Sequence, residues 1–301
     1  MEEVILHNRL QDLYNYLGIE IEQDAEFTVH ALEDLFHDTI TSPVFRANYY
    51  SFLFIKSGMG QYTLDGVTRE AGPHTIYFTN PGHLKSYATQ VPYTGYIVTL
   101  SETFLKQQVN PEVFDDFPFL LAEIVPPGRL EKEEFGEFIS LVEQIYREDR
   151  GSSTYKYRII GNLFVALLLK IKERFWKNYD PTRESDRGSN IVNAFRRDLE
   201  HTYRNLSSLE HLPNVGDYAD RQHLHPNYFS SVIKSKTGRS VHAWIAEKTL
   251  AEARTMLNNP KFSIKEIAFH LKFSEPTHFS KFFKKHSQVT PNAYRKAILQ
   301  A

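Results

Sequence analysis

Two helical patterns follow each other at Ile264-Lys-Glu-Ile-Ala-Phe-His-Leu-Lys-Phe-Ser274 and Phe279-Ser-Lys-Phe-Phe-Lys-Lys285. Their apolar residues recur at steps of three and four, which is the period of an amphipathic α-helix. Pro276 stands near the start of the second helix, after a short turn. Residues 264–287 are therefore predicted to form a helix-turn-helix.

The same pattern occurs 49 to 50 residues earlier in the chain. Val215-Gly-Asp-Tyr-Ala219 aligns with Ile264–Ala268, and Phe229-Ser230 aligns with Phe279-Ser280. This internal repeat predicts a first helix-turn-helix at about residues 212–238.

The spacing within each copy separates an inner face from an outer face. Ala219 and Ala268 are small where two helices would cross closely, and phenylalanine or isoleucine recurs four residues apart on each second helix. The positions left on the outer face are Asn227, Ser230, Ser231, Lys234, Thr277, Ser280, Lys281 and Lys284, with Lys285 beside them. Short hydrogen-bonding side chains with lysines suit the reading of base edges and phosphates, although any solvated helix is polar outside.

Residues 241–258 between the copies predict one amphipathic helix. Its inward residues are Trp244, Ile245, Leu250, Ala253 and Leu257. At ~1.5 Å per residue it would span about 27 Å, a little less than the ~34 Å of one duplex turn. Such a rod would place two reading helices in successive major grooves.

Charge divides the chain near Ser189. Residues 1–188 carry 18 Lys and Arg against 28 Asp and Glu, whereas residues 189–301 carry 17 against nine. A basic domain beside an acidic one suggests that only the former meets a polyanion, although a chance difference in surface charge would look the same. Residues 181–189, polar and without an apolar anchor, are the predicted linker between domains 1–180 and 190–301.

The first domain combines strands with helices. Short aromatic and β-branched runs separated by turn signals predict an all-β sandwich or barrel between Arg46 and Leu100, and Asp65-Gly66 predicts a tight hairpin turn. After Glu131 the period becomes helical, and a second helix carries a broad apolar stripe at Ile160, Leu163, Phe164, Leu167, Leu168, Ile171 and Phe175. That stripe would pack on the barrel or on a second subunit. The fold class is α+β, with an all-α domain following.

The stretch from about Ile191 to Arg295 resembles the DNA-binding domain of AraC/XylS-type transcription regulators. The matching residues are Ile264-x-x-Ile-Ala-x-x-Leu-x-Phe-Ser, Phe279-Ser-Lys-x-Phe-Lys-Lys285, Thr290-Pro291 and Tyr294-Arg295. The resemblance implies that the second helix of each unit reads DNA. Three residues depart from the family pattern: Gln288 and Lys272 replace common glycines, and Thr249 replaces a frequent arginine. A left-handed backbone at either former glycine would cost ~1 kcal/mol.

More loosely, the first domain resembles the cupin-type sensor barrel of this family, followed by a helical dimerisation unit. The strand order of Phe52 to Leu100 and the turn Pro81-Gly82-His83 carry this likeness. It implies a homodimer through the helix around Leu163 to Phe175 and a small-molecule effector inside the barrel. Phe54, Tyr62 and His83 are the candidate effector-binding residues, although strand alternation does not say which face is inside.

Other chemistries are not indicated. The chain has no cysteine, no nucleophile elbow, no phosphate loop and no His-Glu-x-x-His motif, and Gly58-Met-Gly60 leads into a strand. His74 and His83 lack the grouping of a metal-binding cupin, and His223-Leu-His225 falls in a turn. We expect no catalytic residue, metal or cofactor. The acidic start and the short apolar runs predict no export signal and no membrane span, hence a cytoplasmic protein.

The sequence thus favours a DNA-binding transcription regulator that is not an enzyme. Its expected partners are double-stranded DNA, a second copy of the chain, a small effector and, for an activator, RNA polymerase. A second interpretation is a cupin-type ligand-binding or catalytic protein whose basic domain only mediates association. A third is a regulator whose barrel takes no effector.

Overall fold

The structure of the chain, a computed structural model, describes residues 4–121, 128–177 and 187–300. The chain divides into two compact units, residues 1–185 and 186–301. Of the predicted linker, residues 181–186 lie outside the described residues, and helix α7 (Arg187–Arg204) begins directly after them. Each unit has a hydrophobic core of its own.

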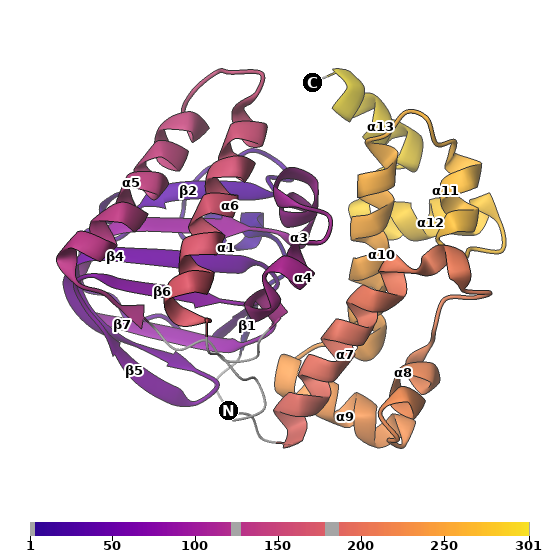
Figure 1. Cartoon of the computed structure of the whole chain (residues 1–301), viewed down its shortest axis with the longest axis horizontal. Helices are drawn as coiled ribbons and strands as arrows, with labels where there is room; N and C mark the ends of the chain where they lie inside the picture. Colours follow the sequence, from indigo (N-terminus) through magenta and orange to yellow (C-terminus); the bar gives the residue numbers. More distant parts are fainter. Residues whose placement is uncertain (1–3, 122–127, 178–186, 301) are drawn as a thin grey trace. The chain divides into compact units, whose positions relative to one another are not determined.

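The described strands of the N-terminal unit form one sheet of eight (Figure 1). They are β1 (Ile5–His7), β2 (Phe27–Ala31), β3 (Phe45–Ala47), β4 (Tyr50–Leu64), β5 (Val67–Ala71), β6 (Thr75–Thr79), β7 (Leu84–Leu100) and β8 (Gly128–Arg129). The hydrogen-bonded order is β1-β3-β7-β4-β6-β8, with β2 also paired to β7 and β5 to β4. The predicted run of strands from Arg46 to Leu100 is confirmed, although two of these strands are long.

The two long strands each belong to two parts of the sheet. Residues 50–55 of β4 pair with β6 and with the end of β7, whereas residues 60–64 pair with β5 and with the beginning of β7. The register between β4 and β7 shifts in between, where Gly58 has a φ of +104° and a Cβ would lie 2.5 Å from the carbonyl oxygen of Pro92. Such irregularities bend a strand, so the sheet folds over itself here.

The predicted barrel is not closed. The path of paired strands ends at β1 and β8, which do not pair with each other in the part of the chain that the structure describes. These strands have only three and two residues, and so offer few backbone groups for closing a ring. The cupin-like barrel is therefore an open, bent sheet with helices after it, which keeps the α+β class.

The predicted hairpin is confirmed at the end of β4. Leu64 pairs with Val67, and Asp65 and Gly66 between them have φ of +48° and +83°. These positive angles are those of a type I′ turn, whose twist matches that of the strands.

Helices α5 (Lys132–Asp149) and α6 (Lys156–Phe175) cover one face of the sheet (Figure 1). The apolar stripe of α6 is buried in the same core as the strands, and the ring of Phe164 meets that of Phe52 edge-on at 5.1 Å. Packing on the sheet therefore takes up most of this stripe. The homodimer through the helix around Leu163 to Phe175 stays a prediction, and the side of α6 that faces away from the sheet is the one left for it.

Shorter helical segments complete the N-terminal unit. They are α1 (Leu10–Tyr16), α2 (Leu32–Leu35), α3 (Glu102–Phe104), η1 (Leu105–Val109), α4 (Val113–Asp116) and η2 (Pro118–Leu121). Helices α1 and α2 contribute Leu13, Tyr14, Leu32 and Leu35 to the lining of a cavity of about 100 Å³ on the inner side of the bent sheet. Neither of these two helices was predicted from the sequence.

The described residues of the C-terminal unit are helical. After α7 come η3 (Leu206–Ser208), α8 (Val215–Arg221), α9 (Pro226–Thr237), α10 (Val241–Leu257), α11 (Ile264–His270), α12 (Pro276–Ser287) and α13 (Pro291–Gln300). Helices α8 with α9 and α11 with α12 occupy the stretches predicted for the two helix-turn-helix units, and α10 joins them (Figure 1). Among the described helices of the whole chain, none has the length and apolar character to cross a membrane.

Candidate nucleic-acid interface

The first helix of each repeat begins with the same polar cap. The Asn214 side chain accepts a hydrogen bond from the backbone N–H of Asp217 at 3.3 Å, and the Ser263 side chain accepts one from the N–H of Glu266 at 3.1 Å. Each acidic side chain in turn accepts from the backbone N–H of its cap residue at 2.7 Å. The hydrogen bond from Ser263 N–H lowers the pKa of Glu266. Reciprocal caps of this kind satisfy N–H groups that the helix leaves unpaired.

The turn between the two helices is also repeated. His223 and Lys272 have left-handed backbones, with φ of +55° and +62°. The next residue donates its backbone N–H into the first helix in both copies: Leu224 to the carbonyl oxygen of Ala219 at 3.0 Å, and Phe273 to that of Ala268 at 2.9 Å. Pro226 and Pro276 then start the second helices, where a missing N–H costs no hydrogen bond. Lys272 therefore has the left-handed backbone that the sequence had left open.

A third correspondence lies at the end of the second helices. The Thr237 hydroxyl donates to the carbonyl oxygen of Ile233 at 2.7 Å, and the Ser287 hydroxyl donates to that of Phe283 at 2.8 Å. The following residues, Gly238 and Gln288, have φ of +73° and +67°. Gln288 therefore holds the left-handed conformation that glycine adopts without strain.

The predicted inner faces are buried. Ala219 and Ala268 have no exposed surface, and neither do Phe229, Ile233, Phe279 and Phe283. These residues share one core cluster with α7 and α10. Because their inner faces pack into one core, α9 and α12 present fixed outer faces to the solvent.

Those outer faces match position by position. Over residues 226–238 and 276–288, each residue of α9 falls in the same class as its partner in α12, whether buried, half-buried or exposed. Of the predicted DNA-binding residues, the exposed ones are Asn227, Ser231, Lys234, Thr277, Lys281, Lys284 and Lys285, and the half-buried ones are Ser230 and Ser280. The predicted residues thus lie on one side of each helix.

The lysines on these faces have no acidic partner. Within the described residues, no carboxylate lies within 4 Å of the ammonium groups of Lys234, Lys281, Lys284 and Lys285. Thr277 is different, because its hydroxyl donates to a carboxylate oxygen of Glu275 at 2.9 Å. Unpaired ammonium groups on two repeated faces are available to phosphates.

Sequence reasoning missed two members of the outer faces. Tyr228 is 45% exposed, and its counterpart His278 is exposed at the same position of α12. The His278 ring lies 3.0 Å from the Ser274 hydroxyl. Both follow a predicted contact residue by one position, so a helical projection with a wider outer face would have included them.

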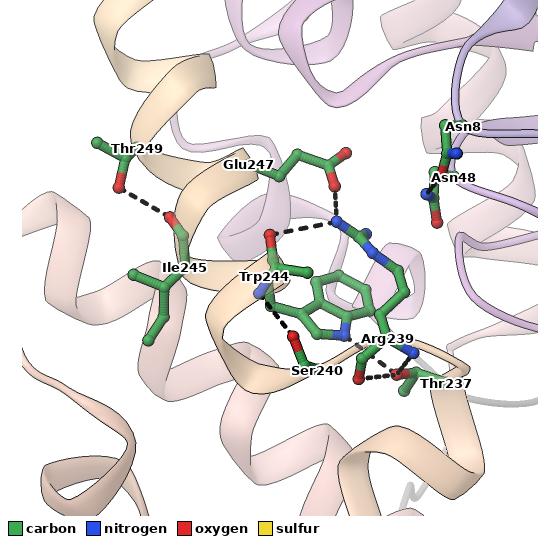
Figure 2. A network of polar contacts seen from close by, with 10 residues as sticks. Asn8, Asn48, Thr237, Arg239, Ser240, Trp244, Ile245, Glu247 and Thr249 are labelled. Carbon is green, nitrogen blue, oxygen red and sulfur yellow. Dashed lines mark hydrogen bonds and ion pairs between the residues drawn. The ribbon is translucent and has the colours of Figure 1, made fainter. Parts of the chain in front are cut away.

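The joint between α9 and α10 is held by side chains (Figure 2). The indole N–H of Trp244 donates to the Thr237 hydroxyl at 3.1 Å, and the Arg239 guanidinium forms an ion pair with Glu247. Arg239 also lies over the Trp244 ring, 4.4 Å from its centre. These contacts fix the angle at which α10 leaves α9.

Further along, α10 is fixed to α7 by buried polar groups. The hydroxyls of Thr249 and Tyr203 are hydrogen-bonded, and Lys248 forms an ion pair with Glu200. Thr249 is 2% exposed, so this position serves the core of the unit here and faces no phosphate.

The three predicted effector residues lie in three different surroundings. Tyr62 lines the cavity on the inner side of the sheet. Phe54 points the other way and belongs to the core between sheet and helices. His83 lies in a turn, where its Nδ1 is 2.6 Å from the Asp65 carboxylate. Burial raises the pKa of Asp65, but the hydrogen bond and charge of His83 outweigh it and leave that pKa below its usual value. The cavity therefore brings together Tyr62 and residues that were not predicted.

Comparisons with known proteins agree with this geometry. Residues 218–297 match the family described as helix-turn-helix domain. The regulatory protein PocR of Salmonella typhimurium is 39% identical over 82 residues, 27% of each chain. The Msm operon regulatory protein of Streptococcus mutans is 25% identical over 85% of this chain and 87% of its own, and the arabinose operon regulatory protein of Escherichia coli is 22% identical over 83% and 86%.

Among solved structures, that of ToxT from Vibrio cholerae is similar. The match covers 91% of this chain and 98% of ToxT, at 14% identity and a TM-score of 0.37. The chain spans about a quarter of PocR but most of the two operon regulators. Residues 218–297 therefore form a helix-turn-helix domain of the AraC type, and the chain is similar over most of its length to two operon regulatory proteins.

Proposed function

We propose that this chain regulates transcription in the cytoplasm by laying α9 and α12 into successive major grooves of double-stranded DNA. The observation that carries the proposal is the matched pattern of exposed residues on the two helices. A single solvated helix would also be polar outside, but chance does not explain two copies that agree in caps, turns and exposed positions.

The exposed residues divide by chemistry. Lys234, Lys281, Lys284 and Lys285 supply charge for phosphates, which contributes affinity with little sequence preference. Asn227, Ser231 and Thr277 are short and carry hydrogen-bond donors and acceptors, which suits contacts to base edges. Asparagine pairs with adenine through two hydrogen bonds, so Asn227 is expected to contribute most to sequence selection.

Replacement of one lysine tests the proposal. Lys281→Ala in the full chain should weaken binding to the operator fragment roughly 3- to 30-fold and reduce the slope of log K against log salt by about one. The measurement is fluorescence anisotropy at several salt concentrations, on an operator found by genomic footprinting.

The matched control is Lys132→Ala, which removes the same charge from an exposed position of α5 in the other unit. It should leave both affinity and slope unchanged. If Lys281→Ala also changes neither quantity, α12 does not face the phosphates, and equal losses in both variants would show only a long-range effect of net charge.

We further propose that a small effector binds in the cavity of the N-terminal unit and controls DNA binding. The cavity is larger than a water site needs, because one water takes roughly 10–15 Å³ on the same measure. Thermal stabilisation of the full chain across a panel of metabolites tests this, and a panel without effect favours a regulator without an effector.

A homodimer is the proposed oligomer, through the outer side of α6 in place of its buried stripe. Leu169 is 52% exposed there, beside an ion pair of Lys170 with Glu137 at 2.5 Å. Sedimentation velocity of the full chain measures the oligomeric state, and Leu169→Asp should shift a dimer toward monomers.

A further inference from the structure

The cavity of the N-terminal unit has an apolar body. Its walls come from the inner side of β4, β6 and β7 and from the short helices α1 and α2. The aliphatic side chains include Leu13, Leu17, Leu32, Leu35, Leu53 and Ile55. Aromatic rings of six tyrosines complete it, and burial raises the pKa of two of them, Tyr87 and Tyr93, to about 12. The tyrosine hydroxyls therefore stay protonated at neutral pH.

A lysine lies in the wall of this apolar cavity. Lys85 on β7 is only 7% exposed, and its ammonium donates to the Thr79 hydroxyl at 2.6 Å. No carboxylate lies within 4 Å of that ammonium in the described part of the chain, and the cavity wall itself contains no acidic residue. A buried ammonium normally has a counter-charge, because without one its desolvation is not compensated.

A hydroxyl near Lys85 lacks a hydrogen-bond partner. The Tyr49 hydroxyl is buried without a hydrogen bond in the described residues, and the Lys85 ammonium lies 5.9 Å from the centre of the Tyr49 ring. Ser51 and Thr79 are directly paired across β4 and β6 and line the same cavity. The Lys85 ammonium and the hydroxyls of Tyr49, Ser51 and Thr79 thus lie in the wall of a largely apolar space.

We propose that this cavity binds a small monocarboxylate with an apolar body, its carboxylate on Lys85 and its body among the leucines. A single ammonium matches a single negative charge, whereas a phosphate dianion would bring a second charge for which the wall has no cation. The proposal rests on the proposed effector function and names the chemical class of the effector.

The ionisation of Lys85 gives the proposal a pH signature. Burial lowers the pKa of Lys85 to about 7, and the more distant Asp65 only partly offsets this. The other titratable groups around it are Tyr49, whose pKa is raised well above its usual value by burial, and His7, whose pKa is lowered by burial. Tyr49 therefore stays neutral near pH 7. Above about pH 7, Lys85 must take up a proton before a carboxylate binds, so the affinity for a carboxylate should fall about tenfold for each further pH unit.

The test is calorimetry of the full chain with hexanoate and phenylacetate, each compared with a neutral molecule of the same size, hexan-1-ol and phenylacetamide. At least one acid should bind ten times more tightly than its neutral match at pH 6.5. Lys85→Met should remove that preference and leave the neutral ligand unaffected. Tyr49→Phe should weaken the acid a few-fold. The matched control, Lys56→Met, removes a lysine that pairs with Glu143 at 2.7 Å and does not line the cavity, and should bind the acid as the unchanged chain does.

The melting temperature of Lys85→Met distinguishes ligand binding by Lys85 from a purely structural role, and DNA binding without ligand tests the regulator function separately. If Lys85 only stabilises the fold, Lys85→Met lowers the melting temperature of the empty protein, whereas the proposal predicts an equal or higher one, since a buried charge without a partner is removed. Acids that bind no better than their neutral matches, an unchanged preference in Lys85→Met, or no binding by any of the four molecules would overturn the carboxylate assignment. DNA binding by the same preparation is measured without ligand, so its failure would count against the regulator function independently of the cavity.

Discussion

Gln288 in the second repeat has a left-handed backbone conformation, which is strained for residues other than glycine. Gln288 ends α12 with φ of +67°, where Gly238 ends α9 with +73°. Gln288→Gly should raise the free energy of unfolding by about 0.5–1 kcal/mol, because glycine adopts a left-handed conformation without the steric cost of a Cβ. Urea denaturation of the full chain, followed by circular dichroism, measures the change.

Gly238→Ala is the reciprocal control, and it should lower the free energy of unfolding by about 1 kcal/mol. Val289→Gly changes a neighbouring exposed residue to glycine outside the left-handed position and should not stabilise the unit. If Gln288→Gly destabilises the protein as Val289→Gly does, the contact of the Gln288 side chain with the carbonyl oxygen of Lys285, at 3.2 Å, is worth more than the strain.

Between elements, the largest single effect is expected where α7 meets α10. Lys248 and Glu200 form an ion pair in which the side chains are 2% and 9% exposed. Lys248→Met leaves a buried carboxylate without its cation and should cost about 3–5 kcal/mol. Lys248→Met combined with Glu200→Leu removes both charges and should recover most of that loss in the same urea measurement.

Arg174→Met, at a half-exposed pair with Glu134, serves as the comparison and should cost under about 1 kcal/mol. A small loss in Lys248→Met would mean that Glu200 is satisfied by other groups. Since the pair joins α7 to the connecting helix, a large loss would show that this contact stabilises the DNA-binding unit.

The elements that the sequence predicted best are those with a repeated pattern. The bounds, turns and inner residues of α8, α9, α11 and α12 follow from local spacing, and two copies reinforce each other. In the N-terminal unit, the alternation along β4 is visible, but both faces are apolar: Phe54 packs on helices and Ile55 lines the cavity. Sequence alone cannot say which face is inner, so Phe54 was chosen and the buried Lys85 was not.

The apolar stripe of α6 is another case in which the sequence does not identify the packing partner. Its residues fit a sheet or a second subunit equally well, because burial leaves the same pattern whichever partner covers it. The open edge of the sheet was also beyond prediction, since β1 and β8 are too short to be distinguished from loops. Such features depend on contacts between residues far apart in the chain, and the local spacing of apolar residues does not indicate those contacts.

The two parts of the chain differ in net charge and in the kind of site that each contains. The acidic N-terminal part has a cavity with an apolar body, and the basic C-terminal part has unpaired lysines on two repeated faces. An acidic surface repels the duplex, so we expect DNA contacts in the C-terminal unit.

The length of α10 determines which spacing of two DNA half-sites a single chain is expected to bind. Helix α10 has 17 residues and is about 26 Å long at 1.5 Å per residue, and its N-terminal half is fixed by the Trp244 and Lys248 contacts. A stiff connection within one chain tolerates one spacing of the two half-sites. Insertion of 5 base pairs between them should lower affinity at least tenfold by turning one half-site to the opposite side of the duplex.

Insertion of 10 base pairs should lower it as much, although the half-site returns to the original side, because α10 cannot reach another ~34 Å along the duplex. Two half-sites read by separate chains would tolerate the longer insertion. Anisotropy with the three operators therefore distinguishes the two arrangements, and equal affinity for the original and the 10-base-pair insertion would mean that one chain does not read both half-sites.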